Sequence, residues 1–233
     1  GGGGGGSSSR VTTTTTEVTT DATADDTTET TTATVENSTE STTVQAVTFS
    51  DVPADYWGAK YINELASNKV VNGYSDGTFL PNNEVKRADF IIMLLKGIGV
   101  DVTKAPQSNF SDVENGAYYY NAVGLAKDLG IANGNGDGTF SPASNITRQD
   151  MMVMVANALN AMGVELDTDV ACLDNFSDTV GIANYARTSV AALVNAGIVK
   201  GSDNKIEPVK NITRAEMAQL VKGVYDKALT IAE

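Results

Sequence analysis

The sequence contains no histidine and only one cysteine, Cys172. Without histidine, Ser-His-Asp triads, Cys-His dyads and HExxH metal sites are all excluded. A single cysteine cannot close an intramolecular disulfide or supply the thiolates of a zinc site. We therefore expect no metal centre and no cofactor.

The chain also lacks long apolar runs and an excess of basic residues. Its longest apolar run, residues 90–95, is far too short to span a bilayer. Lys and Arg number 16 against 29 Asp and Glu, which gives a net charge of −13 and disfavours nucleic-acid binding. Neither an initiator Met nor a signal peptide is present, so we expect a piece of a longer protein. No membrane insertion is expected.

Residues 1–48 have the composition of an unfolded polymer. They begin with six glycines, and residues 11–48 contain 18 threonines, no lysine, no arginine and no aromatic residue. Such a segment cannot bury enough apolar surface to offset the entropy lost on ordering. We predict a disordered Gly/Ser/Thr-rich linker, which is a candidate for O-glycosylation.

The rest of the chain contains one pattern three times. Phe-Ser-Asp occurs at residues 49–51, 110–112 and 176–178, and an arginine follows each phenylalanine by 38 residues. A proline precedes each arginine by six residues. Fixed spacing of three landmarks in three copies predicts one supersecondary unit used three times. The arginines are Arg87, Arg148 and Arg214.

Each copy has the pattern of two helices joined by a turn. In copy one, Tyr61, Ile62, Leu65 and Ala66 fall on one face of a helix. An Asp-Gly turn follows in copies one and two, where glycine supplies the positive φ of a tight turn, but copy three lacks it. The glycines that end the first helical part are Gly73, Gly134 and Gly201.

The second helix of each copy has a clear start. Thr147 and Thr213 stand at the N-cap with an acid at the third helical position, as in a capping box. Copy one has Lys86 at this position, so its cap is weaker by about 1 kcal/mol. The runs that follow are apolar on nearly every face, which indicates buried helices. We predict an all-α fold in which three such helices form a central bundle about an approximate threefold axis.

Arginine at the first helical position conflicts with the helix dipole, which favours an anion there. The conflict in all three copies has two explanations. One is an ion pair with Asp51, Asp112 or Asp178. The other is that the arginine and the helix N-terminus together bind a carboxylate or phosphate of a ligand. The residues alone leave both open.

An aromatic residue precedes the first helix of each copy: Trp57, Tyr118 and, by position, Tyr185. A place in the hydrophobic core is the favoured interpretation. A flat platform for a sugar ring is the alternative, since Trp is rarely fully buried.

The three copies resemble surface-layer homology (SLH) modules. The resemblance rests on Phe-Ser-Asp-Val-Pro at 49–53 with Trp57, the Val-Asn-Gly-Tyr-Ser-Asp-Gly-Thr-Phe-Leu-Pro segment at 71–81, and Ile-Thr-Arg-Ala-Glu at 212–216. It implies a pseudo-trimer of three tandem modules, with the second helices at the centre and glycan-binding grooves between modules. We expect a linker at 1–48 and modules at 49–109, 110–175 and 176–233.

The resemblance also implies a function. SLH modules anchor exported proteins non-covalently to the bacterial cell wall by binding a secondary cell-wall polysaccharide, commonly pyruvylated and attached to peptidoglycan. We therefore expect a secreted, monomeric chain at the cell wall or S-layer. The candidate ligand-binding residues are Arg87, Arg148, Arg214, Asp51, Asp112, Asp178, Trp57, Tyr118, Tyr185, Gly73, Gly134 and Gly201.

Charge differs sharply among the copies. The linker carries −6, copy one −1, copy two −7 and copy three +1. Copy two has only Lys127 and Arg148 as bases against nine acids, so we predict that a groove lined mainly by copy two binds an anion most weakly. We also expect Arg148→Ala and Arg214→Ala to weaken wall binding with little loss of helix, unless these arginines are structural.

Two other functions compete. One is a protein–protein interaction module for S-layer assembly. The other is a polysaccharide-acting enzyme, but no carboxylate lies in an apolar setting that would raise its pKa for acid catalysis. The segment from Asn133 resembles a calcium loop, yet Ser144 stands where a bidentate Glu is needed. We predict a non-catalytic binding protein.

Overall fold

The computed structural model describes residues 46–232. The predicted linker at 1–48 lies outside the described residues except for its last three positions. Within the described part the chain is helical, and extended pairing is limited to isolated bridges. The all-α prediction is therefore confirmed. The elements are α1 (Ala59–Ser67), α2 (Arg87–Gly97), α3 (Tyr120–Asp128), α4 (Arg148–Ala161), η1 (Val170–Asn175), η2 (Thr179–Gly181), η3 (Asn184–Ala186), α5 (Arg187–Asn195) and α6 (Arg214–Ala232).

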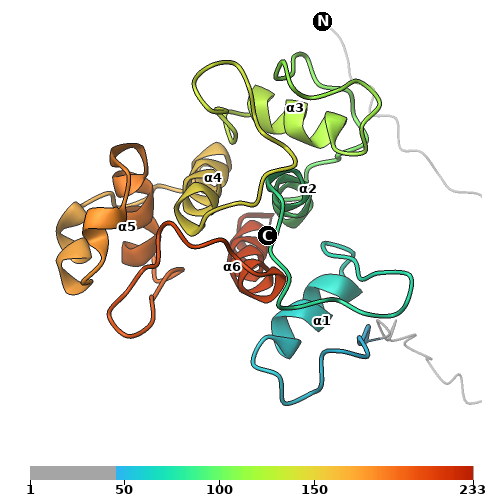
Figure 1. The fold of residues 1–233 in the computed structure, drawn as a ribbon, viewed down its shortest axis with the longest axis horizontal. Coiled ribbons are helices and arrows are strands. Elements are labelled where there is room, and N and C mark those ends of the chain that lie inside the picture. Colours follow the sequence, from blue (N-terminus) through green and yellow to red (C-terminus); the bar gives the residue numbers. More distant parts are fainter. Residues whose placement is uncertain (1–45, 233) are drawn as a thin grey trace, which may run out of the picture. The chain divides into compact units, whose positions relative to one another are not determined.

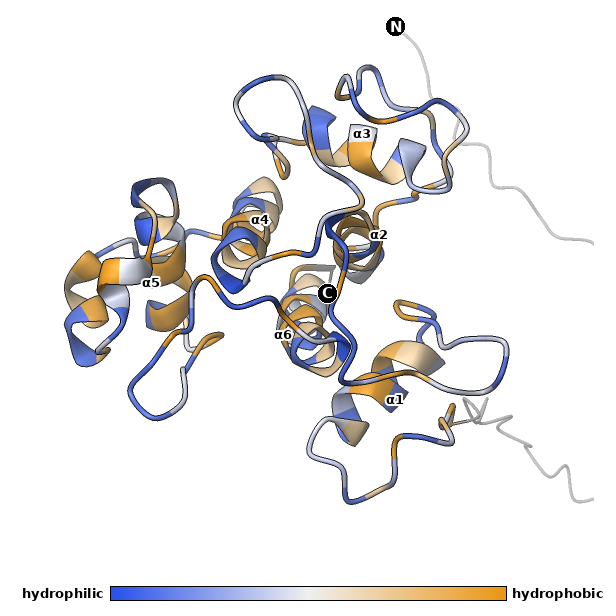
Figure 2. Ribbon diagram, in the orientation of Figure 1, coloured by the Kyte–Doolittle hydropathy of each residue, from blue (hydrophilic) through white to orange (hydrophobic). Residues whose placement is uncertain are grey.

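Helices α2, α4 and α6 lie at the centre, and each begins at the arginine that the repeats mark (Figure 1). Most of their apolar residues are buried, among them Phe90, Leu94 and Met152, while Leu229 and Ile231 near the end of α6 are exposed. Burying one such side chain stabilises a fold by about 1.5–3 kcal/mol. Figure 2 shows hydrophobic residues around the central helices. The central three-helix bundle and its approximate threefold arrangement are confirmed.

The outer helices α1, α3 and α5 pack across the borders of the repeats. Helix α3 of copy two packs on α2 of copy one, and α5 of copy three packs on α4 of copy two. These pairs are consecutive in the chain, as neighbouring elements usually are. Helix α1 of copy one instead packs on α6 of copy three, which brings the two ends of the folded segment together (Figure 1). The three copies thus form a closed ring.

Backbone hydrogen bonds close the same ring where the central helices begin. Val85 N donates to Ile212 O at 3.1 Å, Ile212 N to Ile146 O at 3.2 Å, and Ile146 N to Val85 O at 2.9 Å. All three side chains are buried. Each copy therefore satisfies one backbone donor of the next without forming a sheet.

The turns between the helices follow the predicted chemistry. Gly77 and Gly138 of the two Asp-Gly turns have φ values of +82° and +86°. In copy three, Asp203 and Asn204 take up positive φ instead, between the bridged residues 202 and 205. Asp and Asn tolerate this conformation better than other non-glycine residues, so copy three keeps a tight turn without glycine.

No helix between residues 46 and 232 combines the length and the hydrophobicity that crossing a membrane requires.

Candidate functional site

Three equivalent grooves lie between the copies, and we name each after the inner helix that forms its floor. The α2 groove has a volume of about 320 Å³, the α4 groove about 540 Å³ and the α6 groove about 340 Å³. Each combines a glycine and an acid of one copy with the arginine of the preceding copy in the ring. The triplets are Gly73, Asp89 and Arg214 in the α2 groove, Gly134, Asp150 and Arg87 in the α4 groove, and Gly201, Glu216 and Arg148 in the α6 groove.

The three arginines link each copy to the next. Arg87 Nε donates to Phe140 O at 2.9 Å, Arg148 Nε to Ile206 O at 2.8 Å, and Arg214 Nε to Phe79 O at 2.8 Å. Each side chain thus leaves its own helix and reaches a carbonyl in the neighbouring copy. This placement resolves the conflict with the helix dipole, because the charge is satisfied away from the helix axis.

Arg214 is buried among aromatic rings. Its guanidinium carbon lies 4.3 Å from the ring centre of Phe79 and 5.2 Å from that of Tyr74. Its Nη2 donates to Asn72 O at 2.9 Å. Burial lowers the pKa of the guanidinium, yet an arginine remains charged at any physiological pH. The α2 groove therefore holds a desolvated positive charge.

The ion pairs differ from the predicted ones. Arg87 Nη1 lies 3.4 Å from Asp150, and Arg148 Nη1 lies 3.9 Å from Glu216. Within residues 46–231, Arg214 has no carboxylate oxygen within 4 Å. The explanation by an ion pair with the aspartates of Phe-Ser-Asp is therefore wrong, because the acids that face the arginines stand at the third position of the inner helices.

The aspartates of Phe-Ser-Asp hold the backbone of their own copy. Asp112 accepts hydrogen bonds from Phe140 N at 2.8 Å and Ser141 N at 2.7 Å, so each carboxylate oxygen binds one amide. Ser141 has a φ of +58°, which a non-glycine residue adopts only when its surroundings hold it there. Asp51 and Asp178 make the same pair of bonds, to Phe79 and Leu80 and to Ile206 and Glu207. None of the three lines a groove.

The predicted glycines line the grooves, and a phenylalanine of the same copy packs against each of them. A Cβ at Gly73 would lie 2.2 Å from the ring of Phe49. At Gly134, whose φ is +72°, it would lie 2.5 Å from Thr139 O and 2.6 Å from the ring of Phe110. Gly201 meets Phe176 in the same way. The phenylalanine and the glycine of each copy therefore pack as one unit, and the contact leaves no room for a side chain at the glycine.

The predicted aromatic residues are exposed, so the core interpretation is wrong. Trp57 is 52% exposed, Tyr118 70% and Tyr185 61%. Tyr118 Oη donates to Asp89 at 2.6 Å across the α2 groove, and Tyr185 Oη donates to Asp150 at 2.6 Å across the α4 groove. Each of these tyrosines stands two residues before the outer helix of its copy, as Trp57 does, which confirms that the three positions are equivalent.

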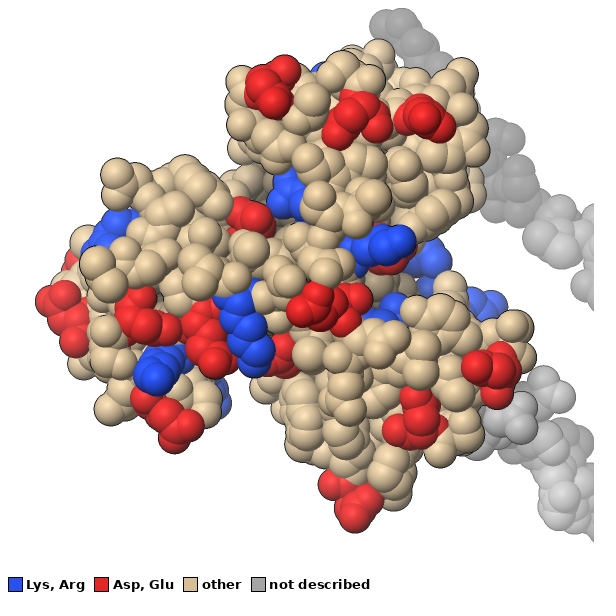
Figure 3. Space-filling model, in the orientation of Figure 1, with Lys and Arg blue, Asp and Glu red and all other residues tan. Residues whose placement is uncertain are grey.

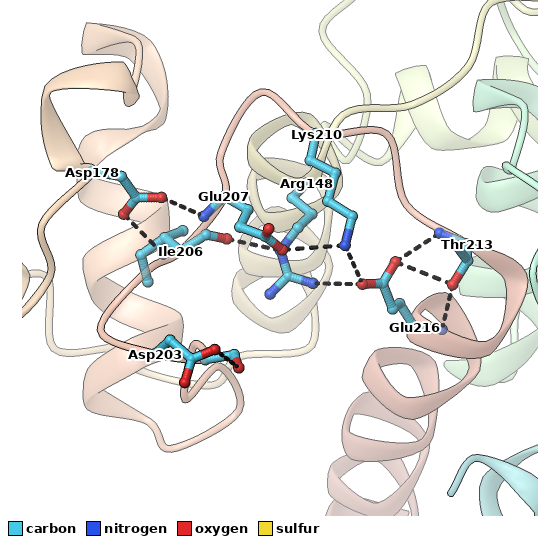
Figure 4. Close-up of polar contacts among 9 residues, drawn as sticks. Arg148, Asp178, Asp203, Ile206, Glu207, Lys210, Thr213 and Glu216 are labelled. Carbon is cyan, nitrogen blue, oxygen red and sulfur yellow. Dashed lines mark hydrogen bonds and ion pairs between the residues drawn. The ribbon is translucent and has the colours of Figure 1, made fainter. Parts of the chain in front are cut away.

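The α6 groove lacks this tyrosine–acid contact, and its acid has other partners (Figure 4). Glu216 accepts from Thr213 N at 2.8 Å and from Lys210 Nζ at 3.1 Å, while its own amide donates to Thr213 Oγ1. This is the predicted capping box. Burial raises the pKa of Glu216, but the bonds from Thr213 and Lys210 outweigh it and lower the pKa below its usual value.

The first amides of the inner helices are not available to a ligand. Arg87 N donates to Ser144 O at 2.9 Å and Ala88 N to Pro142 O at 3.1 Å, and the other two helices repeat this arrangement. The expectation that the helix N-terminus itself contacts an anion is therefore wrong for these amides. Lys86 makes no side-chain cap bond, in agreement with its predicted weaker cap.

The charge balance differs among the grooves. The α4 groove is lined mainly by copy two, and its only cation, Arg87, is paired with Asp150 beside apolar Val153 and Met154. The α2 groove adds Lys96, which the sequence analysis missed. Its position seven residues after Asp89, on the same helical face, was the available signal.

Comparison with known proteins identifies the repeats. The S-layer homology domain profile matches residues 48–91, 109–152 and 175–218, more than half of the chain. The chain belongs to the S-layer homology domain family. SLH domains occur in S-layer and cell-surface proteins, so the expected location, secreted and at the bacterial cell wall or S-layer, is supported.

Relatives of two kinds share this segment. The chain is 34% identical over 182 residues to an amylopullulanase of Thermoanaerobacterium thermosulfurigenes and 32% identical over 185 residues to exoglucanase XynX of Acetivibrio thermocellus. It is 32% identical over 176 residues to the S-layer protein sap of Bacillus anthracis. These matches cover 75–79% of the chain but only 10%, 17% and 21% of the relatives. The enzymes and the S-layer protein therefore resemble this chain over a minor part of their own length.

Proposed function

We propose that this chain anchors an exported protein non-covalently to the bacterial cell wall by binding a pyruvylated secondary cell-wall polysaccharide in the grooves between its SLH modules. The observation that carries the proposal is that each groove joins the arginine of one copy to a glycine and an acid of the next copy. In the α2 and α4 grooves an exposed tyrosine completes the set.

The chemistry of the grooves suits an acidic sugar. A pyruvate ketal adds a carboxylate to a sugar ring, and a guanidinium binds carboxylates with charge-assisted hydrogen bonds. Exposed Tyr118 and Tyr185 offer flat aromatic faces and a hydroxyl each.

We infer that the chain binds without catalysis. In the α4 groove the single carboxylate, Asp150, is already bonded to Tyr185 and paired with Arg87. Glycosidases need two carboxylates facing the scissile bond with distinct roles. The α2 groove likewise offers only Asp89. The α6 groove has two acids, but Glu216 is bonded to Lys210 and Asp226 to Lys222. The relatives that are enzymes match this chain through the SLH segment alone, which fits an anchoring role.

Binding to purified cell-wall sacculi tests the proposal. Sacculi are prepared with the wall polymer intact, with the ketals removed by mild acid, and with the polymer stripped. We expect strong binding only to the first. Equal binding to intact and deketalated sacculi would reject the pyruvate claim, and binding that persists on stripped sacculi or on S-layer protein alone would favour a protein–protein module.

A further inference from the structure

The floor of each groove is one face of its inner helix, and the three floors differ at one end. Counting from the acid, the floor positions are 0, 3, 4 and 7, which share a helical face. The last position is Lys96 in α2, Asn157 in α4 and Gly223 in α6. Asn157 donates to Ile131 O at 3.2 Å and Gly223 has no side chain. Only α2 therefore has a charged residue at this floor position. At the same end of the α6 groove, Lys222 and Asp226 are paired with each other.

Lys96 and Arg214 lie at opposite ends of the α2 groove. Arg214 lies at the same end of the groove as Asp89. In the equivalent α4 groove, Arg87 of the preceding copy is paired with Asp150 in this way. Asp89 and Lys96 are seven residues apart on one helix, which corresponds to about 10 Å of helical rise. This separation exceeds the width of a single hexose ring.

Neither cation is neutralised within the part of the chain that the structure describes. Arg214 is 9% exposed, and neither it nor Lys96 has a carboxylate oxygen within 4 Å among residues 46–231. Asp89, the acid of this groove, accepts the hydroxyl of Tyr118. A buried guanidinium whose hydrogen bonds go to neutral carbonyls retains its attraction for an anion.

The other grooves differ in this respect. In the α4 groove Arg87 is paired with Asp150. In the α6 groove Arg148 is paired with Glu216, and Lys222 lies 2.9 Å from Glu64. Figure 3 shows Lys and Arg side chains gathered between the lobes that carry α1 and α3, and mixed acidic and basic side chains beside α6. The α2 groove thus has the most available positive charge.

We propose that the α2 groove is the principal anion-binding groove and that it holds an acidic glycan at two points. Arg214 binds the carboxylate of one sugar residue, and Lys96 binds an acidic group on a neighbouring residue. The inference deepens the proposed wall binding and rests on it. It assigns to Lys96 a role in selecting a glycan with repeated acidic groups.

The test compares Lys96→Gln with the matched variant Lys104→Gln. Lys104 is an exposed lysine of the same copy that lines none of the grooves and, like Lys96, has no ion pair within the described residues. Two probes are titrated by calorimetry: a monosaccharide with one pyruvate ketal, and a fragment of the same polymer with at least two ketals. Loss of a charge-assisted contact predicts that Lys96→Gln binds the longer fragment about tenfold more weakly and the monosaccharide equally well. Lys104→Gln is expected to change either affinity by less than twofold.

Other outcomes overturn the inference. Equal losses for Lys96→Gln and Lys104→Gln, or a loss for the monosaccharide as large as for the fragment, would show that Lys96 makes no second contact. Lys96→Arg keeps the charge and should retain affinity, while circular dichroism reports whether each variant folds. If the wild-type chain still binds sacculi in these cases, only the role of Lys96 is rejected and the proposed function remains supported. Absence of wild-type binding to both probes would reject the two proposals together.

Discussion

Arg214 Nε donates a hydrogen bond to Phe79 O at 2.8 Å and so joins the last copy of the repeat to the first. The two residues are 135 positions apart in the chain. The same guanidinium faces the α2 groove. One side chain therefore holds two copies together and presents a positive charge to the groove between them.

Arg214→Ala is expected to lower stability as well as binding. The substitution leaves the carbonyls of Phe79 and Asn72 without their charged donor, which costs about 2–4 kcal/mol of unfolding free energy. This differs from the expectation, drawn from the sequence, of weakened binding with little structural loss. Urea unfolding followed by circular dichroism measures the change. Lys60→Ala, an exposed substitution on α1, is the control and should fall within about 0.5 kcal/mol of the wild type. Wild-type stability of Arg214→Ala would show that the cross-copy bond contributes nothing.

Asp112→Ala should destabilise the protein without a direct effect on binding. The carboxylate accepts two backbone amides and lies outside the grooves, so its removal is expected to cost at least about 2 kcal/mol. The midpoint of thermal unfolding measures this loss, and Glu114→Ala, an exposed acid of the same copy, should change it little. Affinity for the wall polymer, measured well below the midpoint, should match the wild type. A specific loss of affinity in the folded variant would instead make Asp112 a ligand contact.

Gly134→Ala and Gly136→Ala separate backbone strain from crowding. Both glycines have positive φ, +72° and +89°, so both substitutions strain the backbone by about 1–2 kcal/mol. Only at Gly134 would the new Cβ meet neighbours, at 2.5 Å and 2.6 Å, while nothing lies within 4 Å of it at Gly136. We expect Gly134→Ala to cost at least about 1 kcal/mol more in chemical denaturation. Equal losses would mean that the groove wall yields to a methyl group.

The hydrogen bond from Tyr185 to Asp150 predicts that the protein loses stability at alkaline pH. Burial, together with the hydrogen bond to Asp150, raises the pKa of the Tyr185 hydroxyl to about 12, from an ordinary value near 10. Because the folded state binds this proton more tightly, the contribution of Tyr185 is complete below about pH 10 and is lost as the pH rises toward 12. Between pH 9 and pH 11.5, the midpoint temperature of thermal unfolding should therefore fall less steeply with pH for Tyr185→Phe than for the wild type. Parallel curves would show that the hydroxyl of Tyr185 is not held by Asp150 in solution.

The features of the fold that depend on local sequence patterns were predicted correctly. The repeated arginine, the capping threonines and the apolar runs placed the start of each inner helix and the central bundle correctly. Asp-Gly identified two turns, and the third was also a turn because Asp203 and Asn204 accept positive φ. These features depend on residues close together in the chain.

Contacts between residues that lie far apart in the chain could not be predicted from local patterns. Nothing local distinguishes an aspartate that binds the amides of Phe79 and Leu80 from one that pairs with an arginine. The exposure of Tyr118 depends on where copy two rests on α2, which follows from the closure of the ring. Amphipathic patterns show that a helix has a buried face, but not which helix covers it.

The packing of α1 on α6 sets how many copies the fold contains. In an open array of repeats, units can be added or removed, and terminal repeats with polar outer faces protect the ends. Here the inner helix of the last copy is covered by the outer helix of the first, so neither end needs a cap. Deleting one copy, or inserting a fourth, would leave α6 and α1 unable to meet and would expose both apolar faces. The closed ring therefore ties the number of copies to the packing of α1 on α6, while the residues that line each groove can differ.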